Sequence, residues 1–361
     1  MARKFNEENE RIKRRYLQYL REAKRRDMAT VDKAATAILR FEKSTGYKPF
    51  KRFHIEQAVT FKNRLSNEKN PRTGAPLSKA TVDSTLRAVK AFIHWLAGQP
   101  GYKSRISYAD ADYFNLNAKD ARIAHTAREE IFPTPQQCRH AFNQMPSATP
   151  LQRRDRALFA FLMLTGARDG AVASLRLKHV DLVENCVYQD ARDVNTKFAK
   201  TFTTWFFPVD DAYLQAFGDW VTYLRQFELF GPTDALFPKP KMGLKDGAFA
   251  ALGLSRDTYA NAGKLRTVIK DAFTNAGLPA FAPHSFRKTL GLLANDHCKT
   301  PEQFKAWSMN LGHESISTTL SSYCPVSPSR QGELIKDMAH CSDETKTVDH
   351  QQTDAIQNSD D

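Results

Sequence analysis

The residues that could do chemistry gather in the last third of the chain, in Pro283-His284-Ser285-Phe286-Arg287, Leu311-Gly312-His313 and Tyr323. His284 and Arg287 are three positions apart, so they share one face of a helix, and Pro283 is typical of a helix start. Such a helix would direct both cations and its first backbone N–H groups at an anion. With a second histidine and a tyrosine close behind, these parts fit phosphoryl chemistry with a tyrosine nucleophile.

Each of these residues also has a structural explanation that needs no catalysis. His284 could be a helix N-terminal residue that is satisfied by the backbone, and His313 could lie in the turn that ends a helix. Tyr323 could complete an apolar helical stripe with Ile316 and Leu320. Only the combination of these residues favours an active site.

The charge of the chain is strongly positive and unevenly distributed. The net charge is +13, although residues 340–361 hold six acids and one lysine, so the preceding 339 residues carry +18. A body with this charge attracts polyanions, and nucleic acid is the leading partner class. On charge alone, a basic but otherwise ordinary surface remains the alternative. The acidic tail has low hydrophobicity, and it is predicted to be disordered.

Composition also bounds the class of protein. The chain has 361 residues, 41% of them hydrophobic and 26% charged, which leaves room for two globular domains. The longest apolar run, residues 157–164, is too short to span a bilayer, and the first residues contain no apolar signal segment. The five cysteines are widely spaced without a Cys-x-x-Cys pair, so neither disulfides nor a zinc site are predicted. We therefore expect a cytoplasmic protein with no membrane partner.

The first 118 residues are predicted to be helical. Residues 1–26 hold ten Lys or Arg against four Glu, with apolar residues at helical spacing, so we expect a basic amphipathic helix or arm. This helix could lie along a phosphate backbone, pack on a neighbouring subunit, or be merely solvated. Residues 27–118 are predicted to form a helical domain, with helices that begin near Thr30, His54 and Ser78.

Two sets of basic residues in this region are candidates for DNA binding. In the helix of residues 78–96 the apolar stripe is expected to face the core, whereas Lys79, Arg87 and Lys90 lie off the stripe. Glycine and proline at positions 98–101 break that helix. Residues 119–133 are predicted to be a basic linker, in which Lys119 and Arg122 could also contact the DNA backbone.

From residue 134 onward the pattern changes to α plus β. A buried helix is predicted at residues 151–164, ending at Thr165-Gly166-Ala167 with Arg168 just beyond it. Residues 180–189 and 201–209 are rich in Val, Thr, Phe and Trp, which predicts the two strands of a hairpin. The polar tip of that hairpin contains Asn195, Lys197 and Lys200.

The rest of this region is predicted to be helical apart from one long loop. Asp210 is expected to cap a strongly amphipathic helix. Several Gly and Pro residues predict a long loop region over residues 230–260. Helices are then expected at residues 261–275, 284–295 and 301–310, so His284 and Arg287 fall in the first turn of one of them.

Several motifs stand in an order that is known from one protein family: Thr165-Gly166-Ala167-Arg168, a hairpin lysine, Pro283-His284-Ser285-Phe286-Arg287, Leu311-Gly312-His313, Thr318-Thr319 and Tyr323. In this order they resemble the tyrosine recombinase, or phage integrase, family. The resemblance covers residues 134–330 closely and the helical region before them more loosely. It implies a mainly α fold with a small antiparallel β-sheet. A helical core-binding domain with a SAM-like fold would occupy residues 27–118, and an α+β catalytic domain residues 134–339.

The resemblance also implies roles for individual residues. The catalytic set that it predicts is Arg168, Lys200, His284, Arg287, His313 and Tyr323. Tyr323 would be the nucleophile, a hairpin lysine the general acid, and the other four would surround the scissile phosphate. Lys200 fits the spacing of the family better than Lys197, so Lys200 is the predicted acid.

Such a set could work without a cofactor. A phosphodiester in transit gains negative charge on its non-bridging oxygens, and two guanidinium groups with imidazole donors can stabilise that charge without a metal. The attack of Tyr323 would form a 3'-phosphotyrosine linkage, and Lys200 would protonate the DNA hydroxyl that leaves. Because the linkage stores the phosphodiester, no ATP is needed. We therefore expect no cofactor and no metal.

The resemblance further implies an assembly. Double-stranded DNA with specific recombination sites would be the partner, and a homotetramer would form on two such sites. Accessory DNA-bending or directionality factors could take part. Residues 329–338, with an apolar edge at Leu334, Ile335 and Met338, are the candidate for docking on a neighbouring protomer. A simple intramolecular helix is the alternative.

Two features depart from the family pattern. His313 and Tyr323 are ten residues apart, one more than is most common, and Ala171 stands where the family often has an acid.

Two other functions stay open. One is DNA relaxation of the type IB topoisomerase kind, in which a monomer acts without pairing two sites. The other is a catalytically silent DNA-binding or architectural protein. The catalytic residue types are intact at every matched position, which argues against this second alternative.

Overall fold

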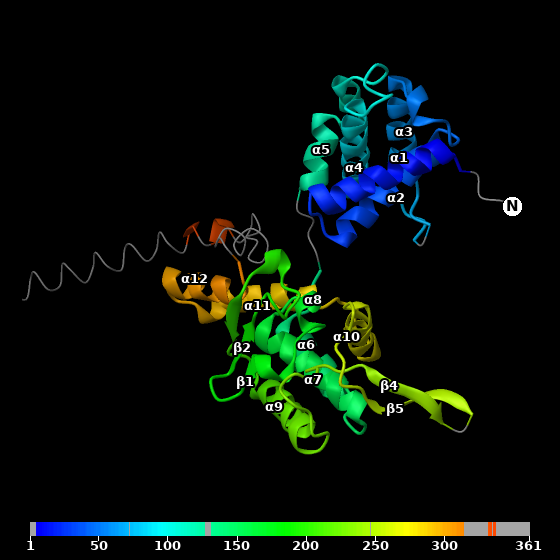
Figure 1. The fold of residues 1–361 in the computed structure, drawn as a ribbon. Coiled ribbons are helices and arrows are strands. Elements are labelled where there is room, and N and C mark those ends of the chain that lie inside the picture. Colours follow the sequence, from blue (N-terminus) through cyan, green and yellow to red (C-terminus); the bar gives the residue numbers. More distant parts are fainter. Residues whose placement is uncertain are drawn as a thin grey trace, which may run out of the picture. The chain divides into compact units, whose positions relative to one another are not determined.

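The computed structural model describes residues 5–71, 73–126, 131–245, 247–313, 331–333 and 335–336. The chain divides into two compact units, Met1–Glu129 and Glu130–Asp361 (Figure 1). Helices dominate both units, and strands β1 to β5 of the second unit form small antiparallel sheets, so the predicted fold class is confirmed. Among the described residues, no helix is both long and apolar enough to cross a membrane.

The N-terminal unit consists of helices joined by short turns. Ser78 caps one helix, as predicted, by accepting a hydrogen bond from Thr81 N. Asp27, rather than the predicted Thr30, caps an earlier one. The elements are α1 (Glu7–Gln18), the π-helical turn η1 (Tyr19–Ala23), α2 (Met28–Ser44), η2 (Phe50–Arg52), α3 (Ile55–Ser66), α4 (Lys79–Ala97), η3 (Tyr108–Phe114) and α5 (Ala118–His125).

The core of this unit is built on α4. The apolar stripe of α4 is buried as predicted, with Phe92 and Ile93 fully enclosed. Aromatic rings make many of the contacts around it. The ring of Phe41 on α2 meets those of Phe61 and Phe114 edge to face, at centroid distances of 5.3 and 5.4 Å.

The basic N-terminal helix is part of this core. Ile12 and Tyr16 of α1 are buried, and the Tyr16 ring lies 5.1 Å from the rings of Phe92 and Trp95 on α4. A helix predicted within residues 1–26 is thus present at Glu7–Gln18, but it belongs to the core of the unit and is not a separate arm. Its apolar face is removed from water by its neighbours in the same unit, and its charged face remains outside.

A buried polar network fastens α1 to α2. The fully buried Glu42 accepts hydrogen bonds from Asn9 Nδ2 at 2.9 Å and from Lys13 Nζ at 2.5 Å. Asn9 also binds the backbone after α2, at Lys48 O (3.0 Å) and Phe50 N (2.9 Å). Burial alone would lower the pKa of Lys13, yet its glutamate partners raise it. Charges that leave water need partners of this kind.

Removal of Glu42 is predicted to destabilise the N-terminal unit strongly. Glu42→Ala leaves the buried Lys13 ammonium with Glu10 as its remaining carboxylate partner and removes one acceptor of Asn9. Breaking a buried pair costs about 3–5 kcal/mol, and the lower end of this range is expected because Glu10 remains. Urea unfolding of the full chain, followed by hydrogen exchange of the α1 and α2 amides, measures the loss. Glu22→Ala, which removes an exposed pair with Arg21, is the matched control and should cost less than about 1 kcal/mol. Equal losses in the two variants would contradict the structure.

The C-terminal unit packs its helices around α7 (Pro150–Thr165). Residues 157–165 of α7 are all buried, which accounts for the near-continuous apolar run in the sequence. The helix begins with a capping box between Thr149 and Gln152, and it ends at Gly166 as predicted. The other helices are α6 (Pro135–Gln144), α8 (Asp169–Val172), α9 (Asp211–Gln226), α10 (Gly263–Asn275), α11 (His284–His297) and α12 (Pro301–Asn310), with the short turns η4 (Leu177–His179) and η5 (Lys197–Ala199).

A three-stranded antiparallel sheet in this unit has the order β1 (Val180–Asp181), β2 (Cys186–Gln189), β3 (Phe202–Trp205). Val187 of β2 pairs with Thr204 of β3, so a hairpin is present as predicted. The single strand predicted over residues 180–189 is corrected, because this range forms two strands, β1 and β2, that pair with each other. Lys200 lies in the connection between these strands, just before β3. Because β2 is the central strand, one edge of β3 faces away from the sheet.

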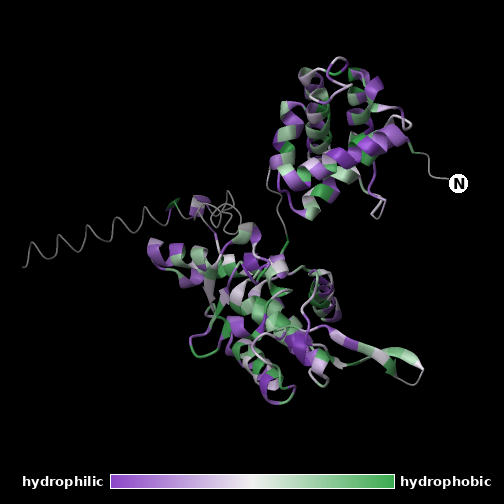
Figure 2. Cartoon of the chain, viewed as in Figure 1, coloured by the Kyte–Doolittle hydropathy of each residue, from purple (hydrophilic) through white to green (hydrophobic). Residues whose placement is uncertain are grey.

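A second hairpin corrects the prediction of a loop over residues 230–260. Strands β4 (Pro240–Lys245) and β5 (Ala248–Leu254) pair in antiparallel fashion (Figure 1). Four large apolar side chains are exposed on this hairpin: Met242, Leu244, Phe249 and Leu252. In Figure 2 much of the hairpin has the green colour of hydrophobic residues. Glycine and alanine fill many of the other positions and have low strand propensity, which hides the strands in the sequence.

The predicted linker over residues 119–133 is also corrected. Residues Ala118–His125 form α5, which packs on α4 within the N-terminal unit. An ion pair of 3.0 Å between Lys79 and Asp120 connects the two helices, and Asn117 caps α5 by accepting from Asp120 N. Residues 127–130 and the predicted acidic tail, residues 340–361, lie outside the described residues.

Candidate active site

Arg287 is the most enclosed of the described catalytic candidates, with 2% of its surface exposed. Helix α11 begins at His284, as predicted, and carries Arg287 one turn later on its buried side. The guanidinium donates from Nη1 to Gly166 O at 2.7 Å and from Nη2 to Leu311 O at 2.6 Å. It therefore joins the end of α7, the start of α11 and the end of α12.

His313 completes this junction. Its Nε2 lies 2.8 Å from Nη2 of Arg287, and because a guanidinium can only donate, Nε2 must be the acceptor. The neutral ring therefore carries its proton on Nδ1. Burial, followed by the positive charges of Arg287, Arg168, His284 and Lys200, lowers the pKa of His313 to about 4. At neutral pH this imidazole is an uncharged hydrogen-bond donor.

Arg287, Arg168, His284 and Lys200 come from three parts of the chain, and each lies near enough to His313 for a positive charge on it to lower the pKa of that ring. Arg168 is half-buried just before α8, and His284 is exposed at the start of α11. Lys200 is half-buried next to β3, whereas Lys197 is exposed on η5. The charge of Lys200 acts on His313, which favours Lys200 over Lys197 as the lysine of this site.

Tyr323, the predicted nucleophile, lies outside the described residues. The structure shows Arg287 and His313 in direct contact, and it places Arg168, His284 and Lys200 near enough to act on His313. The position of the tyrosine and the catalytic roles of all six residues remain predictions. A cluster of guanidinium and imidazole groups suits a phosphate, because both groups donate hydrogen bonds to anionic oxygens.

Gly166 allows the junction to close. Its φ of +56° lies in the left-handed region that favours glycine, and a Cβ there would come within 2.9 Å of both Leu290 Cδ1 and Leu311 Cδ2. The turn presents the Gly166 carbonyl to Arg287 and leads the chain on to Arg168. Sequence analysis predicted the end of the helix here, but not that α11 and the end of α12 pack directly against it.

An acid supports the Arg168 turn, although not at the position of the family pattern. Ala171, which stands at that position, is buried. Instead, Asp169 forms an ion pair with Nε of Arg266 on α10, and its other oxygen accepts from Gly170 N at 2.9 Å. Asp169 and Arg266 are 97 residues apart, and no local pattern in the sequence connects them, so this pair could not be predicted.

The predicted DNA-binding residues fall into two groups. Three of them form ion pairs within the N-terminal unit: Lys79–Asp120 at 3.0 Å, Arg87–Asp83 at 3.4 Å and Lys90–Asp112 at 2.7 Å. Lys119 and Arg122 are exposed on α5. The first group would exchange a carboxylate for a phosphate on binding DNA, which reduces its net electrostatic gain. All five residues remain predictions.

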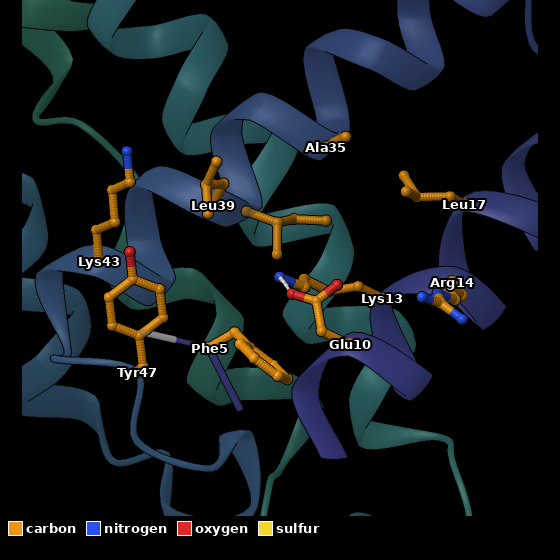
Figure 3. Close-up of a pocket in the computed structure, with 10 residues that line it drawn as sticks. Phe5, Glu10, Lys13, Arg14, Leu17, Ala35, Leu39, Lys43 and Tyr47 are labelled. Atoms are coloured by element: carbon orange, nitrogen blue, oxygen red, sulfur yellow. Dashed lines mark ion pairs between the residues drawn. The ribbon is translucent and has the colours of Figure 1, made fainter. Parts of the chain in front are cut away.

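The N-terminal unit also contains a groove that the sequence did not reveal (Figure 3). The groove has a volume of about 700 Å³ and lies along α1 and α2. Its lining mixes apolar and charged side chains, among them Phe5, Leu17, Leu39, Tyr47 and the ion pair of Lys13 with Glu10. None of the predicted catalytic or DNA-binding residues lines it. The predicted catalytic residues Arg287 and His313 lie in the C-terminal unit instead.

A substitution at Gly166 is predicted to damage this junction. Gly166→Ala must adopt a left-handed backbone and also push Leu290 and Leu311 aside. Gly277→Ala is the matched control, since Gly277 has a φ of +74° with nothing within 4 Å of an added Cβ. Urea unfolding should show that Gly166→Ala costs about 1–3 kcal/mol more than Gly277→Ala, because only it overpacks its surroundings. Equal costs would contradict the close packing.

The stability of the fold is predicted to fall in acid because of His313. Its pKa is about 4 in the folded chain against 6.5 for an ordinary histidine, so the unfolded chain binds the proton first. The stabilisation is complete above pH 6.5 and is lost as the pH falls towards 4. Its full size is about 3 kcal/mol. Urea unfolding between pH 7.5 and 4.5 should therefore show a steeper loss for the wild type than for His313→Gln. An NMR titration midpoint near 6.5 for His313 would contradict the buried, cation-flanked ring.

Comparison with known proteins adds a family. The model of the phage integrase family matches residues 133–330. A search of curated proteins finds no match. Solved structures with a similar fold are recombinases of low sequence identity, among them λ integrase, the Tn1549 transposon integrase and XerH.

The structural similarity extends over most of the chain. The λ integrase fragment of residues 75–356, solved as a dimer bound to a COC' core site, has a TM-score of 0.60 at 12% identity, with 88% of this chain and 95% of that chain covered. The Tn1549 integrase in complex with a circular intermediate DNA has a TM-score of 0.57 at 16% identity, with 91% of this chain and 99% of that chain covered. XerH bound to palindromic difH has a TM-score of 0.56 at 15% identity, with 89% of this chain and 82% of that chain covered. At these identities the likeness shows the fold alone.

The family match covers more than half of the chain. Its range, residues 133–330, includes every described member of the predicted catalytic set, from Arg168 to His313, and also Tyr323. The family expected from the order of the motifs is thus confirmed. The chain belongs to the phage integrase family, whose members are tyrosine recombinases.

Proposed function

We propose that the chain is a site-specific DNA recombinase, which cuts and rejoins duplex DNA through a tyrosine-linked intermediate. The observation that supports this most strongly is the junction of Arg287 and His313, which concentrates hydrogen-bond donors and positive charge in a buried setting. Such a setting suits a phosphate of the DNA backbone. Proteins of similar fold were solved bound to DNA, λ integrase at a core site and XerH at difH.

The proposed reaction is a transesterification at one DNA phosphate. The Oη of Tyr323 attacks the phosphorus, the new bond from phosphorus to Oη forms, and the bond to the 5' oxygen of the next nucleotide breaks. Tyr323 releases its proton to solvent, and the departing 5' oxygen takes one from Nζ of Lys200. The cut strand is then joined through its 3' phosphate to the tyrosine. Attack by another 5' hydroxyl reverses these steps and rejoins DNA without ATP.

The cations supply the stabilisation that this step needs. Arg168 would bind the non-bridging oxygens with its guanidinium fork. Arg287 would donate to them from an N–H group that does not bind Gly166, Leu311 or His313, and Nδ1–H of neutral His313 would donate a further hydrogen bond. Arg287 is already held by two carbonyls and an imidazole, so its donors need no reorganisation when charge develops. The same cations favour the phenolate of Tyr323, whose pKa is ordinarily about 10.

We further propose that the protein acts as a homotetramer that pairs two DNA sites. The cations that would contact the duplex backbone from the N-terminal unit are Lys79, Arg87, Lys90, Lys119 and Arg122. Of the apolar edge predicted for docking on a neighbouring protomer, only Ile335 lies among the described residues, and it is exposed. Its burial against another protomer would remove apolar surface from water. Accessory DNA-bending or directionality factors could assist.

The formation of a covalent adduct tests the proposed chemistry. Nicked duplexes from the DNA that flanks the gene release a short fragment after cleavage, so the adduct accumulates and is separated on a denaturing gel. The wild type should form it and Tyr323→Phe should not. Arg287→Lys should form it about 10²–10³-fold more slowly, because the three N–H groups of an ammonium cannot bind the three acceptors of the junction and also donate to the phosphate, and one oxyanion donor is worth this much.

Three results would count against the proposal. No adduct on any of these duplexes would contradict the enzymatic activity. An adduct that survives Tyr323→Phe would place the nucleophile elsewhere. Plasmid relaxation by the monomer, without strand exchange between two sites, would replace recombination with topoisomerase activity.

A further inference from the structure

Asn310, the last residue of α12, binds the outer edge of the sheet. Its Oδ1 accepts from Trp205 N at 2.8 Å, and its Nδ2 donates to Trp205 O at 2.8 Å. The backbone carbonyl of Asn310 also accepts from the Thr204 hydroxyl at 3.4 Å. One carboxamide thus pairs with both polar groups of a β3 residue on the edge that faces away from β2, as a neighbouring strand would.

A second contact ties β3 to the same turn. Gly312 has a φ of +71°, and a Cβ on it would come within 2.9 Å of Cζ of Phe202. The ring of Phe202 therefore packs on the bare backbone between Leu311 and His313. Strand β3 is held near its end through Trp205 and at its start through Phe202, and both contacts reach the segment that leads from α12 to His313.

These contacts set the position of the predicted general acid. Lys200 precedes Phe202 by two residues, in the connection that β3 carries. The sheet itself is small, with paired strands of four residues at most, and such short strands hold their place only through packing. The segment of Asn310 to His313 is fixed in turn to Arg287 by the hydrogen bonds of Leu311 O and His313.

We propose that Asn310 is a positioning residue that fixes Lys200 relative to the Arg287–His313 junction. This inference rests on the proposed function, in which Lys200 protonates the leaving 5' oxygen. Only a side-chain amide both donates to and accepts from one peptide group in this way. Without it, the hairpin loses its attachment to α12, and a displacement of about 1 Å at a catalytic group costs about 10²-fold in rate.

A change of leaving group separates this role from a merely structural one. Single-turnover cleavage is measured on two nicked duplexes, one with the natural 5' oxygen at the scissile phosphate and one with sulfur in its place. A thiol has a pKa of about 8.5, far below that of an alcohol, so it leaves without protonation. A variant whose defect lies in the general acid therefore recovers on the sulfur substrate, and a variant damaged elsewhere does not.

Asn310→Ala should cleave the oxygen substrate about 10–100-fold more slowly than the wild type, and the sulfur substrate within about 3-fold of it. Lys200→Ala should show the same pattern with a larger loss on oxygen, about 10²–10⁴-fold. Asn310→Asp keeps the acceptor and loses the donor, so it should fall between Asn310→Ala and the wild type. Thermal unfolding of each variant by circular dichroism verifies that it is folded at the assay temperature.

Two controls on the same helix complete the design. Gln303→Ala removes the capping box that starts α12 without touching β3, so any defect it causes should be equal on both substrates. Met309→Ala alters an exposed neighbour of Asn310 and should behave as the wild type. An equal defect of Asn310→Ala on both substrates, or none on either, would overturn this inference alone. Failure of the wild type to cleave either substrate would overturn the proposed function, and this inference with it.

Discussion

The C-terminal unit depends on the hydrogen bonds that one buried guanidinium group donates, that of Arg287. Arg287 gives up its hydration almost completely, and this cost is offset only if its donors find good acceptors. It finds them in Gly166 O, Leu311 O and His313 Nε2. These acceptors are neutral and do not cancel the positive charge. Arg287 thus joins α7, α11 and α12 and also keeps a positive charge at this junction, which would stabilise a bound anion electrostatically.

Other elements of the unit follow from this junction. Gly166 must be a glycine so that its carbonyl can turn to Arg287 while Leu290 and Leu311 pack against it. The turn then delivers Arg168, and the pair of Asp169 with Arg266 holds it on the outer side. Burial of the ring, followed by the positive charges around it, lowers the pKa of His313 to about 4. In the proposed function, the donors around the phosphate are thus already in position before the DNA binds, which is the condition for electrostatic catalysis.

Local signals in the sequence predicted much of this architecture. The bounds of α12, the cap of α4 at Ser78 and the end of α7 at Gly166 all follow from Pro, Ser and Gly at positions where helices start and stop. The order of the motifs predicted the family, which is confirmed. These features depend on neighbours in the sequence, and local patterns report them well.

Features that depend on distant partners escaped prediction. The packing of α1 into the N-terminal core rests on Glu42 and on α4 side chains, the hairpin of β4 and β5 on pairing between glycine- and alanine-rich strands, and the hold on β3 on Asn310. In each case the residue type carries no local signal in the sequence, and its structural role depends on a partner that is distant in the sequence. Tertiary contacts override local propensity in this way wherever a polar group is buried or an edge is covered.

The most direct test of this account is a crystal structure of the chain joined covalently to a nicked DNA site. The account predicts a phosphorus bonded to Oη of Tyr323, with its non-bridging oxygens within about 3 Å of the guanidinium groups of Arg168 and Arg287. It also predicts that the hydrogen bonds of Arg287 to Gly166 O and His313 are unchanged. A phosphate bound away from Arg287, or bonded to another residue, would contradict it.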